Sequence, residues 1–293
     1  MAGQVVLITG CSSGMGLDFA VTMAKDPGQR YIVYATMRSL AKKDKLVKQA
    51  GNTLEKTLFI KQLDVTKEEE IKQIVADIQS ERNCIDILVN NAAFGQYDAA
   101  EKVPLDRIRS IFETNTIGPI RLTQEVIPKM KEKNSGRIIF MGSTMGLCGC
   151  PFGEYYCSTK FALEGFAEAF APLGRQFNIW VSTIEPGPVK TGFAENIAAN
   201  KMGTLFSELD DSNDEKTKEL ARCLSRKMTQ FFTTCTQETS EITKVLLEVI
   251  TAEKPHLRYS TNPTFELSIK RKYVDTYGDQ VVDDTTALFQ KQK

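Results

Sequence analysis

A single turn decides the fold of this chain: Thr9-Gly10-Cys11-Ser12-Ser13-Gly14-Met15-Gly16. It follows the apolar run Val5 to Ile8 and precedes a helix-like segment from Leu17 to Ala24. Glycines let a backbone turn tightly and approach a pyrophosphate, and the start of a helix adds unpaired N–H groups and a positive dipole end. The stretch therefore predicts a cradle for the phosphates of a dinucleotide, although glycine-rich turns between a strand and a helix also serve packing alone.

The composition favours one α/β domain in a reducing compartment. The 293 residues include 37 basic and 37 acidic side chains, so the formal net charge is zero and predicts no nucleic-acid partner. Seven scattered cysteines and a single histidine predict neither a disulfide framework nor a metal site. We therefore expect a cytoplasmic protein.

Membrane attachment is expected to be peripheral at most. No apolar run approaches the roughly 20 residues that span a bilayer. The first strand begins at once, which leaves no room for a signal peptide, and the polar end from Leu288 to Lys293 has no cysteine for lipidation.

Strand-like apolar runs alternate with amphipathic helices along most of the chain. This alternation predicts a single-domain Rossmann fold over residues 1–293, in which helices cover both faces of a doubly wound parallel sheet of about seven strands. Right-handed crossovers give the expected strand order 3-2-1-4-5-6, with a seventh strand near His256 to Ser260. The other expected strands are Val5 to Ile8, Tyr31 to Thr36, a run within 57–65, Ile85 to Val89, Ile138 to Met141 and Ile179 to Ile184.

The alternation stops after Thr191. Residues 193–235 combine scattered large apolar side chains with the charged run Glu208 to Glu219. A long irregular insertion beside a ligand site usually acts as a lid, so we expect a substrate lid over 190–235, the alternative being a solvated surface excursion. The polar stretch 269–293 is expected to form a variable tail.

Four further residues carry chemistry. Asn115 lies in Asn-Thr-Ile-Gly on an expected helix, and Ser143 follows an expected strand. Tyr156 and Lys160 stand four residues apart on the next helix, so their side chains share one face. The glycine turn and these motifs, in this order, resemble those of the short-chain dehydrogenase/reductase family.

Three other stretches narrow the resemblance to one branch of that family. They are Val33 to Arg38, Lys160 to Gly165 and Glu185 to Val189. Members of this branch reduce retinal to retinol, or estrone to estradiol, with NADPH, and the similarity runs from residue 3 to about residue 262. The resemblance therefore implies an NADPH-dependent carbonyl reductase that also works in reverse as an alcohol dehydrogenase.

The proposed catalytic side chains suit this chemistry. Ser143, at the carboxyl edge of the sheet, can hydrogen-bond a substrate carbonyl, and Tyr156 can protonate the carbonyl oxygen as a hydride arrives from the nicotinamide. A free tyrosine has a pKa of about 10, and the ammonium of Lys160 is expected to lower the pKa of Tyr156. The resemblance implies that Lys160 also holds the ribose hydroxyls.

Asn115 is expected to interrupt a long helix from Leu105 to Lys131. Pro119 lies four residues further on and has no N–H, so the helical bond to the Asn115 carbonyl cannot form. The resemblance implies that this asparagine kinks its helix and binds a water that connects to the lysine. A solvent-facing asparagine at a simple proline kink is the alternative.

The cofactor is expected to be NADP(H). NAD enzymes place an acidic residue at the end of the second strand, but no carboxylate occurs here before Asp44. Arg38 can pair with a 2′-phosphate, and Ser12 can donate to it. Ala93 stands where the family usually has glycine, and it is expected to take a negative φ. The resemblance implies dinucleotide contacts from Gly10, Ser13, Gly14, Met15, Gly16, Asp64, Val65, Asn91, Ala92, Tyr156, Lys160, Pro186, Gly187, Val189 and Thr191.

The substrate site is expected to be an apolar tunnel. Its candidates, besides Ser143 and Tyr156, are Met145, Leu147, Phe152, Phe193, Met202 and Phe206. The resemblance implies that a steroid phenol needs a histidine anchor, but the only histidine, His256, lies at the start of a strand and not in the lid. Retinal is therefore the favoured substrate and estrone the alternative. A third hypothesis, a non-catalytic NADPH-binding protein, is disfavoured because the tyrosine and the lysine are both present.

A homodimer is expected, because family members usually pack the helices of Asn115 and Tyr156 against those of a second subunit. Candidates for an outer apolar stripe are Phe161, Phe166, Phe170 and Leu173, some of which must instead face the sheet.

Overall fold

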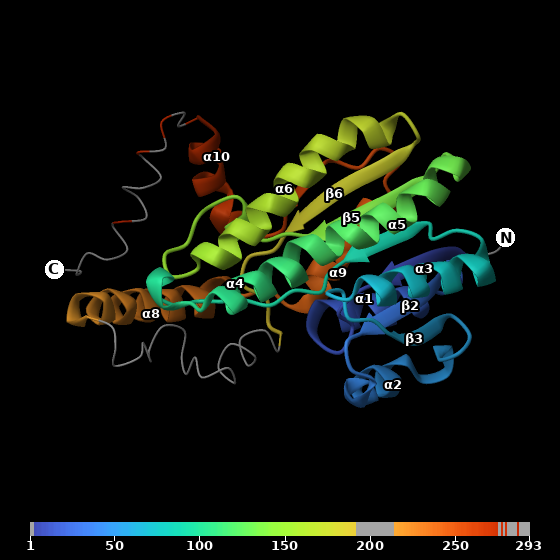
Figure 1. Cartoon of the computed structure of the whole chain (residues 1–293), viewed down its shortest axis with the longest axis horizontal. Coiled ribbons are helices and arrows are strands. Elements are labelled where there is room, and N and C mark those ends of the chain that lie inside the picture. Colours follow the sequence, from blue (N-terminus) through green and yellow to red (C-terminus); the bar gives the residue numbers. More distant parts are fainter. Residues whose placement is uncertain (1–2, 192–213, 275–276, 278, 280–285, 287–293) are drawn as a thin grey trace.

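The computed structural model is built around one parallel sheet with helices on both faces (Figure 1). It describes residues 3–191 and 214–274, together with residues 277, 279 and 286. The sheet has seven strands in the order β3-β2-β1-β4-β5-β6-β7, so the predicted fold class and strand order are confirmed. The strands are β1 Gln4–Ile8, β2 Tyr31–Met37, β3 Leu58–Gln62, β4 Ile87–Asn90, β5 Gly136–Met141, β6 Ile179–Glu185 and β7 Arg258–Ser260.

The two faces of the sheet form two separate cores because successive side chains of a strand point to opposite sides. In β1, Val6 and Ile8 belong to one buried cluster, while Val5 and Leu7 belong to the other. The first cluster lies under α1 Gly14–Ala24, α2 Asp44–Ala50 and α9 Thr239–Thr251, and the second lies under α3 Glu68–Arg82, α5 Gly118–Lys133 and α6 Glu154–Arg175.

Three elements differ from the sequence-based expectation. The helix expected from Leu105 to Lys131, with an interruption at Asn115, is α4 Leu105–Phe112, a π-helical turn Glu113–Ile117, and α5, so the π geometry is the unexpected part. The expectation of an irregular insertion over 193–235 is wrong for its second half, which forms the helix α8 Glu215–Cys235. The stretch expected as a tail from residue 269 begins inside another helix, α10 Glu266–Val274.

The helix α8 forms because one of its faces is apolar, a pattern that is hard to see beside the charged run. Ala221, Leu224 and Met228 recur at intervals of three and four residues, which places them on one helical face. Ala221 and Leu224 are buried against the rest of the chain, so this face, and not the overall polarity of the segment, decides its structure.

Within the described part of the chain, none of the helices has the length and apolarity that crossing a membrane requires.

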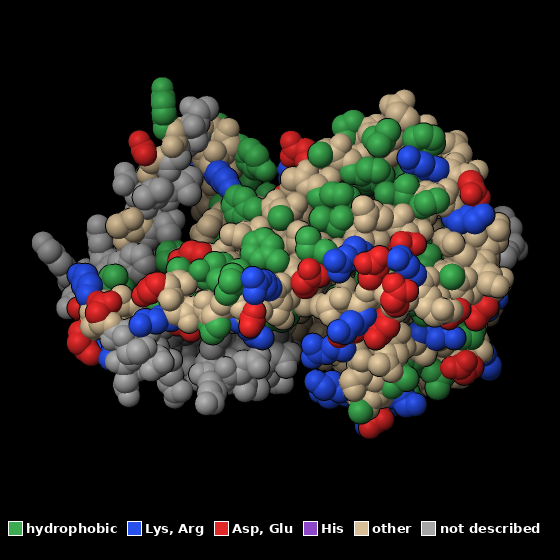
Figure 2. Space-filling model, viewed as in Figure 1, with side chains coloured by type: hydrophobic (Ala, Val, Ile, Leu, Met, Phe, Trp, Pro, Cys, Tyr) green, Lys and Arg blue, Asp and Glu red, His purple; other side chains and the backbone are tan. Residues whose placement is uncertain are grey.

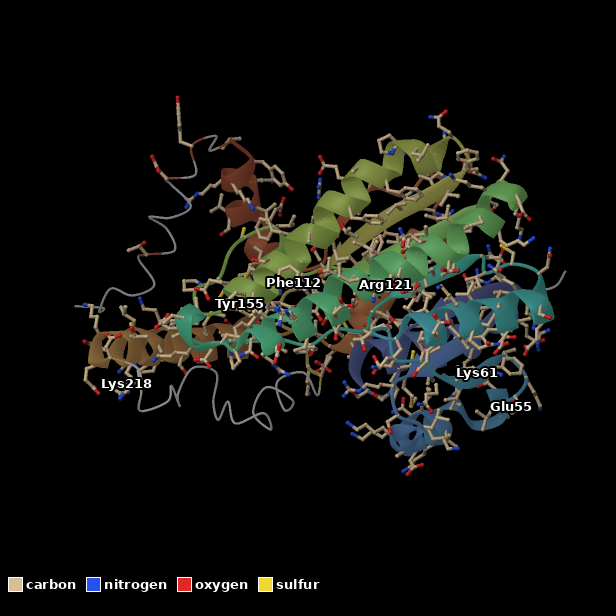
Figure 3. The ribbon with its side chains drawn as sticks, viewed as in Figure 1. Glu55, Lys61, Phe112, Arg121, Tyr155 and Lys218 are labelled. Carbon is tan, nitrogen blue, oxygen red and sulfur yellow. The ribbon has the colours of Figure 1, made fainter. Side chains whose placement is uncertain are left out.

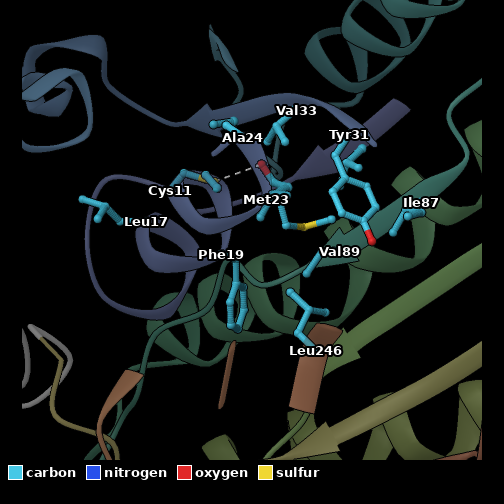
Figure 4. Packing of buried hydrophobic residues seen from close by; sticks show 14 of the residues in the cluster. Cys11, Leu17, Phe19, Met23, Ala24, Tyr31, Val33, Ile87, Val89 and Leu246 are labelled. Atoms are coloured by element: carbon cyan, nitrogen blue, oxygen red, sulfur yellow. Dashed lines mark hydrogen bonds between the residues drawn. The ribbon is translucent and has the colours of Figure 1, made fainter. Parts of the chain in front are cut away.

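The packing of α1 against the sheet predicts a large stability effect at Phe19. This side chain is fully buried between α1, the sheet and Leu246 of α9 (Figure 4). Phe19→Ala is expected to lower the free energy of unfolding by about 3–5 kcal/mol, because it removes apolar contact and leaves a cavity. Denaturant unfolding followed by circular dichroism measures this change.

The matched control is Leu267→Ala on α10, since Leu267 is 60% exposed. Its expected effect is within about 0.5 kcal/mol. Equal losses in the two variants would contradict the packing described for Phe19.

Candidate active site

The glycine turn at the end of β1 is shaped so that only glycines fit. Gly10 and Gly14 have φ values of +74° and +59°, a region that side chains rarely adopt. A Cβ on Gly16 would lie 2.5 Å from Nδ2 of Asn91 and 2.5 Å from the Gly10 carbonyl oxygen. The turn therefore exposes backbone at the start of α1, as a phosphate cradle requires.

Asn91 holds this turn from the neighbouring strand end. Its Nδ2 donates to the carbonyls of Thr9, at 2.8 Å, and Gly10, at 3.3 Å. The backbone N–H groups of Asn91 and Ala92 both donate to the Thr9 hydroxyl at 3.0 Å. Ala93 does not have a positive φ, as expected for a residue with a Cβ.

The segment 186–191, which follows β6, also approaches the glycine turn. Thr191 lies beside Gly14, where an added Cβ would come within 3.1 Å of the threonine side chain. The Pro186 carbonyl accepts from the Thr144 N–H at 3.0 Å, and a Cβ on Gly187 would meet Asn262 at 2.8 Å.

The other predicted cofactor residues lie at the carboxyl ends of the strands or in the glycine turn, and they differ in exposure. Arg38 is exposed directly after β2, and no described residue forms an ion pair with it. Asp64 and Val65 follow β3 and are not part of it, and an Asp64 carboxylate oxygen accepts from the Thr66 N–H at 3.0 Å. The predicted contacts Ser12 and Ser13 are half-buried at the turn, while Met15 and Val189 pack against the core.

The structure brings Ser143 and Tyr156 together. Ser143 caps the short 3-10 turn Thr144–Gly146, and its hydroxyl accepts from the Met145 N–H at 3.1 Å. Tyr156, near the start of α6, is buried and hydrogen-bonds to Ser143. The two hydroxyls therefore face one point at the carboxyl edge of the sheet.

Lys160 lies one turn further along α6 with its ammonium buried. Its Nζ donates to the Met141 carbonyl at 2.7 Å and lies 5.8 Å from the centre of the Tyr156 ring. Burial lowers the pKa of Lys160 to about 8, and the nearby Glu185 opposes this shift.

The pKa of Tyr156 was expected to be lowered by the ammonium of Lys160, but within the protein it is raised. Burial raises the pKa of the Tyr156 phenol above its ordinary value, and the hydrogen bond from Ser143 opposes this only in part. The physical reason is that removing an anion from water costs more than its few polar neighbours return.

Asn115 is buried and fully engaged at the π-helical turn. Its side chain donates to the Phe94 carbonyl at 2.9 Å and to the Thr159 hydroxyl at 3.2 Å, and it accepts from the Phe94 N–H at 3.0 Å. The solvent-facing alternative is therefore wrong. The predicted water site at the Asn115 carbonyl stays a prediction.

The sequence indicated a break at Pro119 but not its form. The Gly118 N–H donates to the carbonyl of Glu113, five residues earlier, which widens the helix to a π turn. Thr116 also donates to the Thr159 carbonyl at 3.1 Å, so the turn is attached to α6 directly beside Lys160.

An apolar cluster surrounds the Tyr156 ring, and we call it the tyrosine cluster. Its buried members besides Tyr156 are Tyr97, Ile111, Ala221 and Leu224, and partly buried side chains pack against them. Two of these, Phe112 of α4 and Tyr155 at the start of α6, are labelled in Figure 3. The partly buried members are Phe94, Phe112, Met145, Phe152, Tyr155 and Met228.

Only some of the predicted substrate residues lie together beside Tyr156. Met145 and Phe152 belong to the tyrosine cluster, whereas Leu147 is buried outside it, with its carbonyl accepting from Lys272. Phe193, Met202 and Phe206 lie outside the described residues.

Sequence reasoning missed Tyr97, whose ring centre lies 5.9 Å from that of Tyr156 and whose hydroxyl contacts the Met145 sulfur at 3.4 Å. It sits in a loop without periodicity, so no pattern marked it. The α8 residues Ala221 and Leu224 were also missed, although their helical spacing carried a signal.

These features define a short chain dehydrogenase, and the chain belongs to that family, whose model matches residues 4–202. It is an oxidoreductase of this family. The chain is 39% identical over 287 residues to retinol dehydrogenase 8 of Homo sapiens, covering 98% of this chain and 90% of that protein. It is 36% identical to 17-beta-hydroxysteroid dehydrogenase type 1 of Homo sapiens, covering 96% and 84%.

Solved structures agree on the fold. A short-chain dehydrogenase from Streptomyces avermitilis superposes with a TM-score of 0.77 at 25% identity, covering 97% of this chain and 98% of that one. A serine dehydrogenase complexed with NADP+ superposes with a TM-score of 0.71 at 26% identity, covering 89% and 95%.

The close approach at Gly16 predicts a loss of dinucleotide binding when a methyl is added. Gly16→Ala must displace both the Asn91 side chain and the Gly10 carbonyl, and it is expected to weaken NADPH binding about tenfold or more. Titration of NADPH fluorescence measures the dissociation constant.

Gly165→Ala on α6 is the matched control, because a Cβ there meets no atom within 4 Å. It is expected to bind NADPH as the parent does. Unchanged binding in Gly16→Ala would contradict the cradle.

Proposed function

We propose that this protein is an NADPH-dependent carbonyl reductase that converts all-trans-retinal to retinol, with Tyr156 as the proton donor. The observation that carries this proposal is the tyrosine cluster, which surrounds the Tyr156 phenol with apolar and aromatic side chains. Apolar surroundings of this kind beside the proton donor suit a long apolar aldehyde.

The residues at the sheet edge fit the cofactor. The glycine turn leaves space that a Cβ would fill, and Arg38 is exposed directly after β2, where it would be available to pair with a 2′-phosphate. The serine dehydrogenase of similar fold was solved as a complex with the dinucleotide NADP+. When bound, NADPH supplies the hydride for the substrate carbonyl carbon.

The catalytic side chains of this chain hold and deliver the proton. The Ser143 hydroxyl hydrogen-bonds the substrate oxygen, and the Tyr156 hydroxyl gives its proton to that oxygen. Because burial raises the pKa of Tyr156, the phenol stays protonated at neutral pH, which is the form that can give a proton to the substrate oxygen. The Lys160 ammonium has two N–H groups besides the one on Met141, and these are proposed to hold the ribose hydroxyls.

Reduction of estrone is the alternative, and the 36% identity with 17-beta-hydroxysteroid dehydrogenase type 1 supports it. Against it, His256 is exposed before β7 and lies against Tyr259, with ring centres 5.7 Å apart. Because its ring is occupied with Tyr259 at an exposed position, we propose that His256 does not anchor a steroid phenol.

The proposed homodimer uses the outer side of α6. Phe161 and Leu173 are 38% and 51% exposed, and Figure 2 shows hydrophobic side chains gathered over this part of the surface. The other two candidates, Phe166 and Phe170, pack against the core under α6.

We further propose that residues 190–235 act as the substrate lid, that residues 269–293 form a variable tail, and that the protein is cytoplasmic with at most peripheral membrane contact.

The substrate proposal is tested by the rate of NADPH oxidation with all-trans-retinal and with estrone at matched low concentrations. A strong preference for retinal is expected. Tyr156→Phe is expected to lose about 10²–10⁴-fold in kcat while still binding NADPH, because only the proton donor is removed. A preference for estrone would overturn the substrate proposal, and an active Tyr156→Phe would overturn the assignment of the donor.

Cofactor choice is tested by reversing the charge at residue 38. Arg38→Asp is expected to shift the preference from NADPH to NADH, because the variant repels a 2′-phosphate and can accept from ribose hydroxyls. Ratios of kcat/KM for the two cofactors measure it, with Arg30→Asp, at an exposed arginine paired with Asp26, as the control. A variant that retains its NADPH preference would refute the role of Arg38.

A further inference from the structure

Two buried glutamates lie directly behind Ser143, and the proposed reaction does not use them. Glu185 is the last residue of β6 and has no exposed surface, while Glu164 lies on α6 and is 6% exposed. Glu164 follows Tyr156 and Lys160 at the same interval of four residues, so all three share one face of α6. The Glu164 carboxyl neighbours that of Glu185 and raises its pKa.

Each carboxyl group has one oxygen with a donor and one without. Oε2 of Glu185 accepts from the Ser143 N–H at 2.7 Å, and Oε2 of Glu164 accepts from Nε of Arg258 at 2.6 Å. The Oε1 atoms of both residues are buried with no hydrogen-bond partner among the described residues, and the neighbouring Thr183 hydroxyl lowers the pKa of Glu185 only in part. Two adjacent buried carboxylates would repel, whereas one proton between them satisfies both oxygens.

We propose that Glu164 and Glu185 share one proton at neutral pH, and that the neutral Glu185 carboxyl is a positioning residue that fixes Ser143 for the substrate oxygen. Arg258 holds the Glu164 carboxylate, and Glu185 donates the shared proton to it. This inference rests on the proposed function only for its effect on turnover. The shared proton itself is a property of the protein alone.

The close packing around Glu185 supports a fixed position. A Cβ on Gly142 would overlap the Glu185 carboxyl group, so the glycine before Ser143 is needed to admit it. The Glu185 carboxyl group therefore lies against the backbone of Gly142 and also accepts from the N–H of Ser143.

The charged and titratable groups that face the pair are Lys160, Tyr156 and Glu168 on α6, Arg258 on β7 and Tyr273 on α10. The cations of Lys160 and Arg258 favour one negative charge on the pair, and the ion pair with Arg258 holds that charge on Glu164. Burial and the neighbouring Glu164 raise the pKa of Glu185 well above its ordinary value. A proton on Glu185 removes a negative charge that would otherwise raise the pKa of Tyr156 and of Lys160.

Infrared difference spectroscopy tests the shared proton without any substrate. The parent protein is expected to show the C=O stretch of a protonated carboxyl at neutral pH, with a shift in D2O, and Glu185→Gln is expected to lose it. Glu168→Gln is the matched control, because Glu168 pairs with the same Arg258 but is exposed, and it is expected to keep the band. Absence of the band in the parent, or its survival in Glu185→Gln, would overturn the proposal.

Turnover then tests the positioning role. Glu185→Gln keeps an acceptor for Ser143 and a donor for Glu164, so it is expected to retain most of kcat. Glu185→Ala keeps neither, and it is expected to lose about 10- to 100-fold in kcat with the KM for NADPH unchanged. An equal loss in both variants would show that the negative charge matters and would overturn the neutral state, whereas a parent inactive with every carbonyl would overturn the proposed function and leave the infrared result standing.

Discussion

The buried ammonium of Lys160 is the constraint on which the site depends. A charge removed from water needs a partner, and Lys160 finds one in the Met141 carbonyl at the end of β5. Met141 is the last residue of β5 to pair with β6, so its carbonyl lies at the edge of the sheet. Because α6 is rigid, fixing Lys160 there also fixes Tyr156 one turn before it and Glu164 one turn after it.

Burial of this single helix face sets the protonation of the site. It raises the pKa of the Tyr156 phenol and lowers that of the Lys160 ammonium to about 8. The same burial raises the pKa of Glu185. A buried site of this kind keeps a proton on the phenol, which is the state needed to protonate a carbonyl oxygen. Neighbouring groups whose pKa values are shifted in opposite directions are typical of acid–base catalysis.

Local patterns predicted the scaffold because they act over short distances along the chain. The alternation of apolar runs with amphipathic helices, together with right-handed crossovers, predicted the strand order, and the interval between Tyr156 and Lys160 placed both on one face. The break near Pro119 was also visible in the sequence, since a missing N–H is a property of one residue. Its π geometry was not visible, because it depends on how Asn115 and Thr116 contact α6.

What the sequence did not predict depends on tertiary burial. The direction of the Tyr156 pKa shift was missed because a neighbouring lysine is visible in a sequence, whereas complete enclosure of the phenol is not. Tyr97 reaches the cluster from an aperiodic loop, and Glu164 meets Glu185 only after α6 packs on β6. In α8, the charged residues masked a helical face that is decided by contact with the tyrosine cluster.

The most direct test is a single turnover with NADPH that carries deuterium at both C4 positions of the nicotinamide, followed by mass spectrometry of the product. With all-trans-retinal as substrate, the retinol formed is predicted to contain one deuterium, on the carbon that carried the carbonyl oxygen. Retinol formed without deuterium, or no retinol from protein that binds NADPH, would contradict hydride transfer to retinal at this site.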